Sequence, residues 1–238
     1  MSILNASALT LRFYFSTLVY MSLFNILKRG FDIFVSLSAL IILLPILLVI
    51  GLTIRLSSKG PAVFKQQRAG KNGKPFVFYK FRTMKTIVEP FGPSPKSDKD
   101  PRLTKVGKFL REYSLDELPQ LCNILKGDMS IVGPRPLYLS QMSEWSERQK
   151  KRLLVKPGLT GLAQISGRGH ITREEKLELD VQYVETVNFL ADIKIILVTI
   201  VQVFRQEGIY EKRYSQTEYT RQNPKCTTQD TRPENPCP

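Results

Sequence analysis

The most constraining feature of this chain is an apolar run from Ile33 to Ile54 that holds no charged residue over 22 positions. As a straight helix it would be about 33 Å long at ~1.5 Å per residue, enough to cross a hydrocarbon core of ~30 Å. Pro45 lies near its middle, where a proline removes a backbone hydrogen bond and bends the helix. The run therefore predicts a Pro-broken helix embedded in a membrane.

Basic residues flank both ends of this run, with Lys28 and Arg29 before it and Arg55 and Lys59 after it. The positive-inside rule therefore places neither end outside the cell. This favours a re-entrant helix over residues 28–58 that enters and leaves on the cytoplasmic face. A kinked span and a buried helix of a soluble protein stay open as alternatives. A secretory signal peptide fits poorly, because the run is too long and no small-residue cleavage pattern follows it.

The chain carries 35 Lys and Arg against 21 Asp and Glu, a formal charge of +14. Such a charge favours polyanionic partners: nucleic acid, anionic lipid or a nucleotide diphosphate. No acidic residue occurs from Ile33 to Val88, and basic residues crowd the second half of that stretch, as expected beside the cytoplasmic leaflet. A nucleic-acid-binding protein would not need the apolar run, so no nucleic acid is expected. Three cysteines without metal spacing indicate a reduced, cytosol-facing protein.

A length of 238 residues allows one well-buried core, and we expect one α+β, mostly helical domain over residues 59–209. Residues 1–27 form an interfacial segment, or an extension upstream of a true start at Met21, and the polar tail 210–238 is expected to be disordered. Asn72-Gly73 predicts a tight turn between two strands. Residues 86–101 predict a loop. Helices are expected over 106–113, 172–189 and 190–204.

Two neighbouring acids, Asp116 and Glu117, stand out in the helical part of this domain. Pro119 is tolerated in the first turn of a helix, so a helix is expected from about Asp116 to Lys126. At its positive end both carboxylates would be ionised, fit to bind a divalent cation or to attack an electrophile. Ser114 followed three residues later by Glu117 is also a capping-box pattern. Spacing alone leaves the catalytic and the structural interpretations open.

Two turn-rich segments follow the acidic pair. Pro134 and Pro136 present Arg135 between them, and arginine suits bidentate recognition of phosphate, although a solvated surface arginine fits equally. The block Pro157 to Gly161 is too irregular for a P-loop, but its backbone amides could cradle a nucleotide. His170, alone in a loop, is given no role.

Taken together, the motifs resemble the bacterial sugar transferases, the monotopic polyprenyl-phosphate phosphoglycosyl transferases. The resemblance runs in unbroken order from Lys28 to Ile209. The blocks that carry it are Lys28-Arg29-Gly30-Phe31-Asp32, Tyr79 to Met84, Ser114 to Leu121, Leu125 to Pro136 and Lys156 to Gly161. The chain matches the small forms, without the preceding multi-span module. Leu44 stands where some compact members have a serine.

This resemblance implies transfer of a sugar-1-phosphate from a UDP-sugar to undecaprenyl phosphate at the cytoplasmic face of the bacterial inner membrane. The product would be undecaprenyl-diphospho-sugar, with UMP released, as the first membrane step in assembly of a capsule, O-antigen, exopolysaccharide or glycoprotein glycan. It implies Asp116 as the nucleophile and Glu117 as the ligand of Mg²⁺. The residues implied to line the substrate and phosphate site are Lys80, Arg82, Arg111, Asp128 and Arg135. Membrane lipids are expected partners, and a homodimer is left open.

The runner-up hypothesis is a catalytically inactive membrane scaffold for a polysaccharide assembly complex. Such a scaffold would keep the apolar run and the basic patch. It would have no need of Asp116 and Glu117, and their presence argues against it.

Overall fold

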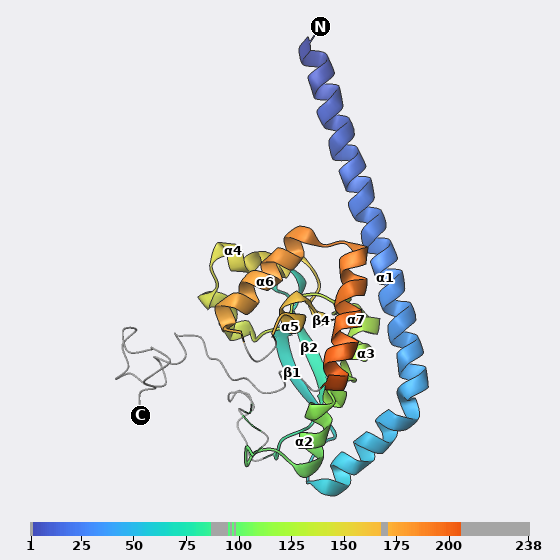
Figure 1. Cartoon of the computed structure of the whole chain (residues 1–238), viewed down its shortest axis with the longest axis vertical. Coiled ribbons are helices and arrows are strands. Elements are labelled where there is room, and N and C mark those ends of the chain that lie inside the picture. Colours follow the sequence, from blue (N-terminus) through green and yellow to red (C-terminus); the bar gives the residue numbers. More distant parts are fainter. Residues whose placement is uncertain (1, 87–94, 96, 98, 168–170, 206–238) are drawn as a thin grey trace, which may run out of the picture.

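The computed structural model describes residues 2–86, 95, 97, 99–167 and 171–205, with side chains from residue 23 onward. It is mostly helical with two small sheets (Figure 1). The helices are α1 (Ser2–Ser57), α2 (Lys105–Glu112), α3 (Gln120–Lys126), α4 (Glu147–Lys150), α5 (Leu162–Ile165), α6 (Arg173–Thr186) and α7 (Phe189–Arg205). The strands are β1 (Val63–Ala69), β2 (Pro75–Phe81), β3 (Ser130–Val132) and β4 (Gly158–Thr160).

Helix α1 contains the apolar run and continues unbroken through residues 27 and 28. It begins as a rod that projects beyond the domain and bends in its lower part, and the domain lies on the inner side of this bend (Figure 1). Its part from Leu23 to Ser57 is long and apolar enough to cross a membrane. One side of it exposes large apolar side chains, among them Phe34, Ile42 and Val49. An exposed apolar face of this extent is compatible with membrane association.

Polar side chains near the start of the apolar run fasten α1 to the domain. Arg29 donates from Nη1 to the carbonyl of Ile124 (2.6 Å) and from Nη2 to that of Leu125 (2.8 Å), both near the end of α3. Asp32, 2% exposed, accepts hydrogen bonds from Ser130 Oγ (3.1 Å) and Ile131 N (3.0 Å). These charges therefore bind carbonyls and amides that the helix end and strand would leave unsatisfied.

Helix α7 lies beside α1 and joins the same assembly. Lys28 forms an ion pair with Asp192 of α7, and the ring of Phe31 meets that of Phe189 edge-on at 5.6 Å. The far side of α7 again exposes large apolar residues, including Leu190 and Phe204. The interfacial or packed helix expected over 190–204 is present, and it is both packed and partly exposed.

The predicted hairpin is confirmed. Strands β1 and β2 pair antiparallel from Val63 opposite Phe81 to Ala69 opposite Pro75. The turn between them places Asn72 and Gly73 at positive φ, 57° and 73°, the conformation that this dipeptide tolerates. The buried Phe76 and Phe78 of β2 then pack with Ile124 and Tyr183 in the main core cluster.

The other predicted helices also form. Helix α6 begins with Thr172 and Glu175 in a reciprocal capping box, and α2 lies within one residue of the expected range at each end. The short parallel pair of β3 and β4 was not expected. Most of the predicted loop over 86–101 and the tail past residue 209 lie outside the described residues.

Candidate active site

The acidic pair lies in a sharp connection between α2 and α3. Helix α2 ends at Glu112, and Ser114 turns the chain with a left-handed conformation at φ 54°. Leu115–Glu117 then form one 3-10 turn, and α3 starts only at Gln120, after Pro119. The predicted helix therefore begins later than expected, and the acids precede it. The side chain of Ser114 makes no cap bond, so the capping-box interpretation is wrong.

Apolar neighbours on both sides hold this turn in place. Leu115 packs with Ile50, Ile54 and Phe81 in one cluster beside the second half of α1. Leu118 packs instead against the main core cluster, together with buried Leu121. The turn that carries the acids thus bridges two clusters, which fixes the direction in which the carboxylates point.

Three cations from separate elements converge on the acids. Lys80 of β2 places Nζ 2.7 Å from Asp116 Oδ2 and 3.5 Å from Glu117 Oε1. Arg135 contacts Glu117 through Nη2 at 2.6 Å and Nη1 at 3.4 Å. Arg111 of α2 lies 3.9 Å from Asp116 Oδ2 and donates from Nε to Thr83 Oγ1 at 3.1 Å. The structure therefore brings together five of the seven residues expected at the site.

The two carboxyl groups have different environments. Asp116 is 2% exposed, and burial raises its pKa, against the opposing effect of Lys80. Burial acts in the same direction on Glu117, but Arg135 and Lys80 outweigh it and hold the pKa of Glu117 well below its usual range. The expected ionised state fits Glu117. The pKa of Asp116 moves the other way, because burial and the neighbouring charge of Glu117 outweigh the effect of Lys80 and Arg111.

Arg82 does not join the acids. Its guanidinium donates to the carbonyl of Lys59 and, at 2.8 Å and 3.0 Å, to the carbonyl and Oγ of Ser58. It therefore satisfies carbonyls at the end of α1. The structure therefore does not bring Arg82 to the acids as the strand pattern predicted. The reason is that β2 ends at Phe81, so the alternation that predicted the direction of Arg82 stops there.

Asp128 contacts Asn123 instead of the two acids. Its carboxylate oxygen is 3.5 Å from Asn123 Nδ2, and its amide donates to the carbonyl of Asn123 at 3.0 Å. Asn123 in turn donates to Val77 O at 2.6 Å. Asp128 thus lies in the turn that ends α3, beside the hairpin.

We expect Arg82→Met to lower the free energy of unfolding by about 2–3 kcal/mol, because buried carbonyls lose a charged donor. Arg148→Met is the matched control, since Arg148 forms an exposed pair with Glu178 and such pairs contribute about 0–1 kcal/mol. Thermal unfolding of the detergent-solubilised variants gives the comparison. An unchanged melting temperature for Arg82→Met, with lost activity, would restore Arg82 to the substrate site.

Two further arginines support the site. Arg68 of β1 stacks over the ring of Tyr138 at 3.7 Å. Phe64 of β1 pairs with Lys80, and Arg68, four residues after Phe64, lies on the same face of the strand because side chains alternate. The hairpin register could therefore have predicted that Arg68 and Lys80 share a face. Arg152 donates to the carbonyl of Arg135 at 2.6 Å and pairs with buried Asp180 at 2.7 Å. This second contact joins residues far apart in sequence and has no local signal.

This arrangement suits chemistry on phosphate esters. Asp116 is a buried carboxyl group beside the cations Lys80 and Arg111, and a carboxylate in such an environment can serve as a nucleophile. Glu117 remains anionic and is partly exposed, at 17% of its side chain. Mg²⁺ commonly binds through one or two carboxylates together with substrate phosphates, so Glu117 is the group at this site that could hold such an ion. The described residues contain no cluster of three or more His, Cys, Asp or Glu that could hold a metal. The site thus has the features of an enzyme of phosphate transfer, and the apolar face of α1 is compatible with membrane association.

Comparison with known proteins narrows that class. Residues 23–206 match the profile of a family described as "Bacterial sugar transferase". This chain belongs to the bacterial sugar transferase family.

Three relatives show the range of sizes. "Uncharacterized sugar transferase EpsL" of Bacillus subtilis is 45% identical over 189 residues, covering 79% of this chain and 93% of the relative. "Exopolysaccharide production protein PSS" of Rhizobium leguminosarum is 44% identical over 192 residues, covering 74% of this chain and 94% of the relative. "UDP-glucose:undecaprenyl-phosphate glucose-1-phosphate transferase" of Escherichia coli K12 is 42% identical over 194 residues, covering 78% of this chain and 42% of the relative. The chain thus spans nearly all of the two small relatives and less than half of the large one.

Proposed function

We propose that the protein transfers a sugar-1-phosphate from a UDP-sugar to undecaprenyl phosphate, giving undecaprenyl-diphospho-sugar and UMP. The observation that carries the proposal is the buried Asp116 with Lys80 Nζ 2.7 Å away and Arg111 3.9 Å away. Family membership and relatives named for undecaprenyl-phosphate sugar transfer support it. The product would enter assembly of a surface or secreted glycan.

The proposed reaction has two halves that share one carboxylate. In the first, an oxygen of Asp116 attacks the β-phosphorus of the UDP-sugar, and the bond to the bridging oxygen breaks, so that UMP leaves with the electron pair. In the second, an oxygen of the acceptor phosphate attacks the same phosphorus and Asp116 leaves as a carboxylate. Covalent catalysis of this kind splits one difficult transfer into two easier ones.

The surrounding cations have separate parts in this proposal. Lys80 holds Asp116 as an anion and lies between the two acids. Arg111 and Arg135 would bind the phosphate oxygens, which suit the guanidinium geometry. Glu117 would hold Mg²⁺, which when bound neutralises charge that builds up on the leaving phosphate.

A panel of UDP-sugars tests the proposal directly. Purified protein should release more than one equivalent of UMP per protein only when undecaprenyl phosphate and the right donor are both supplied. The preferred donor should exceed the others by at least about tenfold in kcat/KM. UMP release is measured for each donor with and without acceptor. No turnover with any UDP-sugar in the panel would refute the proposed reaction.

We also propose that α1 is re-entrant, with both ends on the cytoplasmic face. Pro45 inside the helix and the anchoring of Arg29 and Asp32 to the same domain that follows Ser57 support this topology. A single cysteine at position 20, in a background without the native cysteines, should react with a membrane-impermeant maleimide only after the cells are opened. Labelling of intact spheroplasts would instead indicate a helix that spans the membrane.

A further inference from the structure

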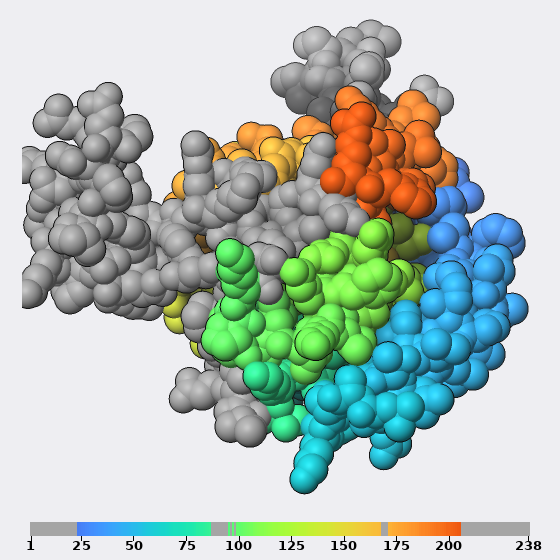
Figure 2. Space-filling model, turned by 60° about the horizontal axis from the view of Figure 1, so that its bottom comes forward, coloured from blue at the N-terminus to red at the C-terminus, as the bar shows by residue number. Residues whose placement is uncertain are grey.

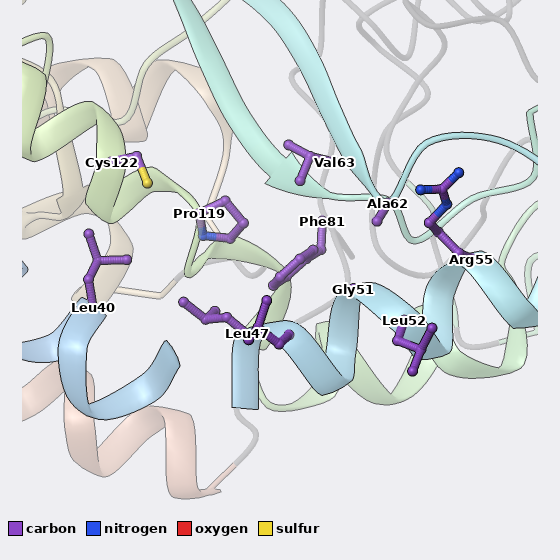
Figure 3. A pocket seen from close by; sticks show the side chains of 11 residues that line it. Leu40, Leu47, Gly51, Leu52, Arg55, Ala62, Val63, Phe81, Pro119 and Cys122 are labelled. Atoms are coloured by element: carbon purple, nitrogen blue, oxygen red, sulfur yellow. The ribbon is translucent and has the colours of Figure 1, made fainter. Parts of the chain in front are cut away.

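An apolar groove of about 460 Å³ lies between α1 and the domain. The α1 side chains that line it come from both sides of Pro45, and the opposite wall comes from the two strands of the hairpin and from α3 with its preceding turn (Figure 3). Ten of its eleven lining residues are uncharged; Arg55, at one end of the row, is the exception. Its volume falls in the range of roughly 300–1,000 Å³ that ligand sites occupy.

The groove lies directly behind the candidate active site. Phe81 lines the groove, while its neighbour Lys80 faces the acids, because adjacent side chains of a strand point to opposite faces. In the same way Pro119 lines the groove, two residues after Glu117. The end of β2 and the turn before α3 therefore form a single layer of main chain between the groove and the carboxylates.

The other wall of the groove belongs to the helix with the exposed apolar face. Leu48 and Leu52 line the groove and are also largely exposed. In Figure 2 the light-blue and cyan part of α1 forms the margin of the molecule, with the green residues of α2 and α3 along its inner side. The groove and the exposed apolar face of α1 thus share Leu48 and Leu52, and an apolar ligand could pass from one to the other there.

We infer that this groove binds the isoprenoid chain of the acceptor during the second half-reaction, an inference that rests on the proposed function. A long apolar chain matches an apolar groove, and its flexible units allow the phosphate at its end to reach Asp116 around the edge of this layer of main chain. A UDP-sugar, which is polar throughout, would not be stabilised by this lining. A phospholipid would fill the groove without any relation to the acids behind it.

Gly51→Leu is the substitution that tests this inference. A Cβ at Gly51 would have only the Cβ of Ala62, 4.0 Å away, as a neighbour, so the backbone position accepts a side chain. Because Gly51 lines the groove, a leucine there should occupy part of it. Gly30→Leu is the matched control, because Gly30 lies in the same helix with nothing within 4 Å of an added Cβ and does not line the groove. We expect KM for undecaprenyl phosphate to rise at least about tenfold in Gly51→Leu, the effect of lost contact with roughly two methylene groups.

The release of UMP without acceptor separates the inference about the groove from the proposed covalent mechanism. One equivalent of UMP per protein should be released from the donor alone by wild type, Gly51→Leu and Gly30→Leu alike. If that burst is present but both variants have the same KM for the acceptor, the groove does not bind the chain. If the wild type gives no burst, the covalent mechanism fails and the groove is judged by binding alone.

Cys122 supplies that binding measurement, since it is exposed and lines the groove. With Cys226 and Cys237 changed to serine, undecaprenyl phosphate in phosphatidylglycerol vesicles should slow maleimide labelling of Cys122 at least about fivefold, given near-saturating acceptor. UDP-sugar should not slow it. Equal labelling rates with and without acceptor, or full protection by the vesicles alone, would overturn the inference in favour of an empty groove or a phospholipid.

Discussion

Asp116→Asn should abolish turnover, with a loss of UMP release of at least about a thousandfold, in the range seen when an enzyme loses its nucleophile. The amide has the shape of the carboxylate but cannot attack phosphorus and leave again. The fold should persist, because Asn adds no charge to this buried position and Lys80 keeps Glu117 at 3.5 Å. Turnover and thermal unfolding of the same preparation test both expectations.

Glu112→Gln is the control for this variant, since Glu112 ends α2 four residues earlier and contacts Lys108 at 4.0 Å. It should retain wild-type turnover. With labelled donor and no acceptor, wild type and control should gain the mass of one phosphosugar on the peptide that carries Asp116, and Asp116→Asn should not. Residual turnover of Asp116→Asn near the control level would remove Asp116 from the role of nucleophile.

Local sequence signals were enough for the elements on which this site is built. Asn72-Gly73 fixed the hairpin, because few other dipeptides accept two positive φ angles. Thr172 and Glu175 marked the start of α6 through a bond between neighbours in sequence. Pro119 located the start of α3 to within a few residues. In each case the information lies within four or five residues of the feature it predicts.

The errors arise where a contact depends on distant residues. Arg82 continues the face of Lys80 in the sequence pattern, yet the chain leaves the strand and the side chain meets the end of α1. The sequence left open that backbone amides after Pro157 could cradle a nucleotide. Instead Gly158 donates to Pro134 O at 2.8 Å, and Gly133 to Thr160 O at 2.8 Å, so those amides join β3 to β4. No local pattern could show that the two segments meet.

The buried Arg152 shows the same limit in the support of the site. It connects Asp180 of α6 to the carbonyl of Arg135, and a lone arginine in a basic sequence gives no sign of either partner. Sequence therefore identified residues that act at the site more readily than residues that hold them in position. The candidate site residues stand in short motifs, whereas the contacts of Arg152 that hold Arg135 in position depend on how α6 packs against the domain.

Chelation should remove activity as completely as the loss of Asp116. We expect turnover to vanish in EDTA and to return when Mg²⁺ is added in excess. The reason is that Arg135 and Lys80 keep Glu117 anionic, and an ionised carboxylate is the oxygen ligand that Mg²⁺ prefers. Without the cation, charge on the departing UMP would be opposed by arginine and lysine alone. UMP release measured against Mg²⁺ concentration gives the apparent affinity.

Glu117→Gln tests whether this carboxylate is the ligand. The amide keeps one oxygen but loses the charge, so the Mg²⁺ concentration for half-maximal turnover should rise at least about tenfold, since even outer partners of a metal ligand cost 10–100-fold when removed. Glu112→Gln should need no more Mg²⁺ than wild type. Arg135 contacts both oxygens of Glu117, so Mg²⁺ would have to replace at least one of these contacts. Binding of the substrate phosphate to Arg135 would weaken its contacts with Glu117 and favour this exchange. Turnover indifferent to EDTA would leave Glu117 with Arg135 as its permanent partner and assign it a structural role.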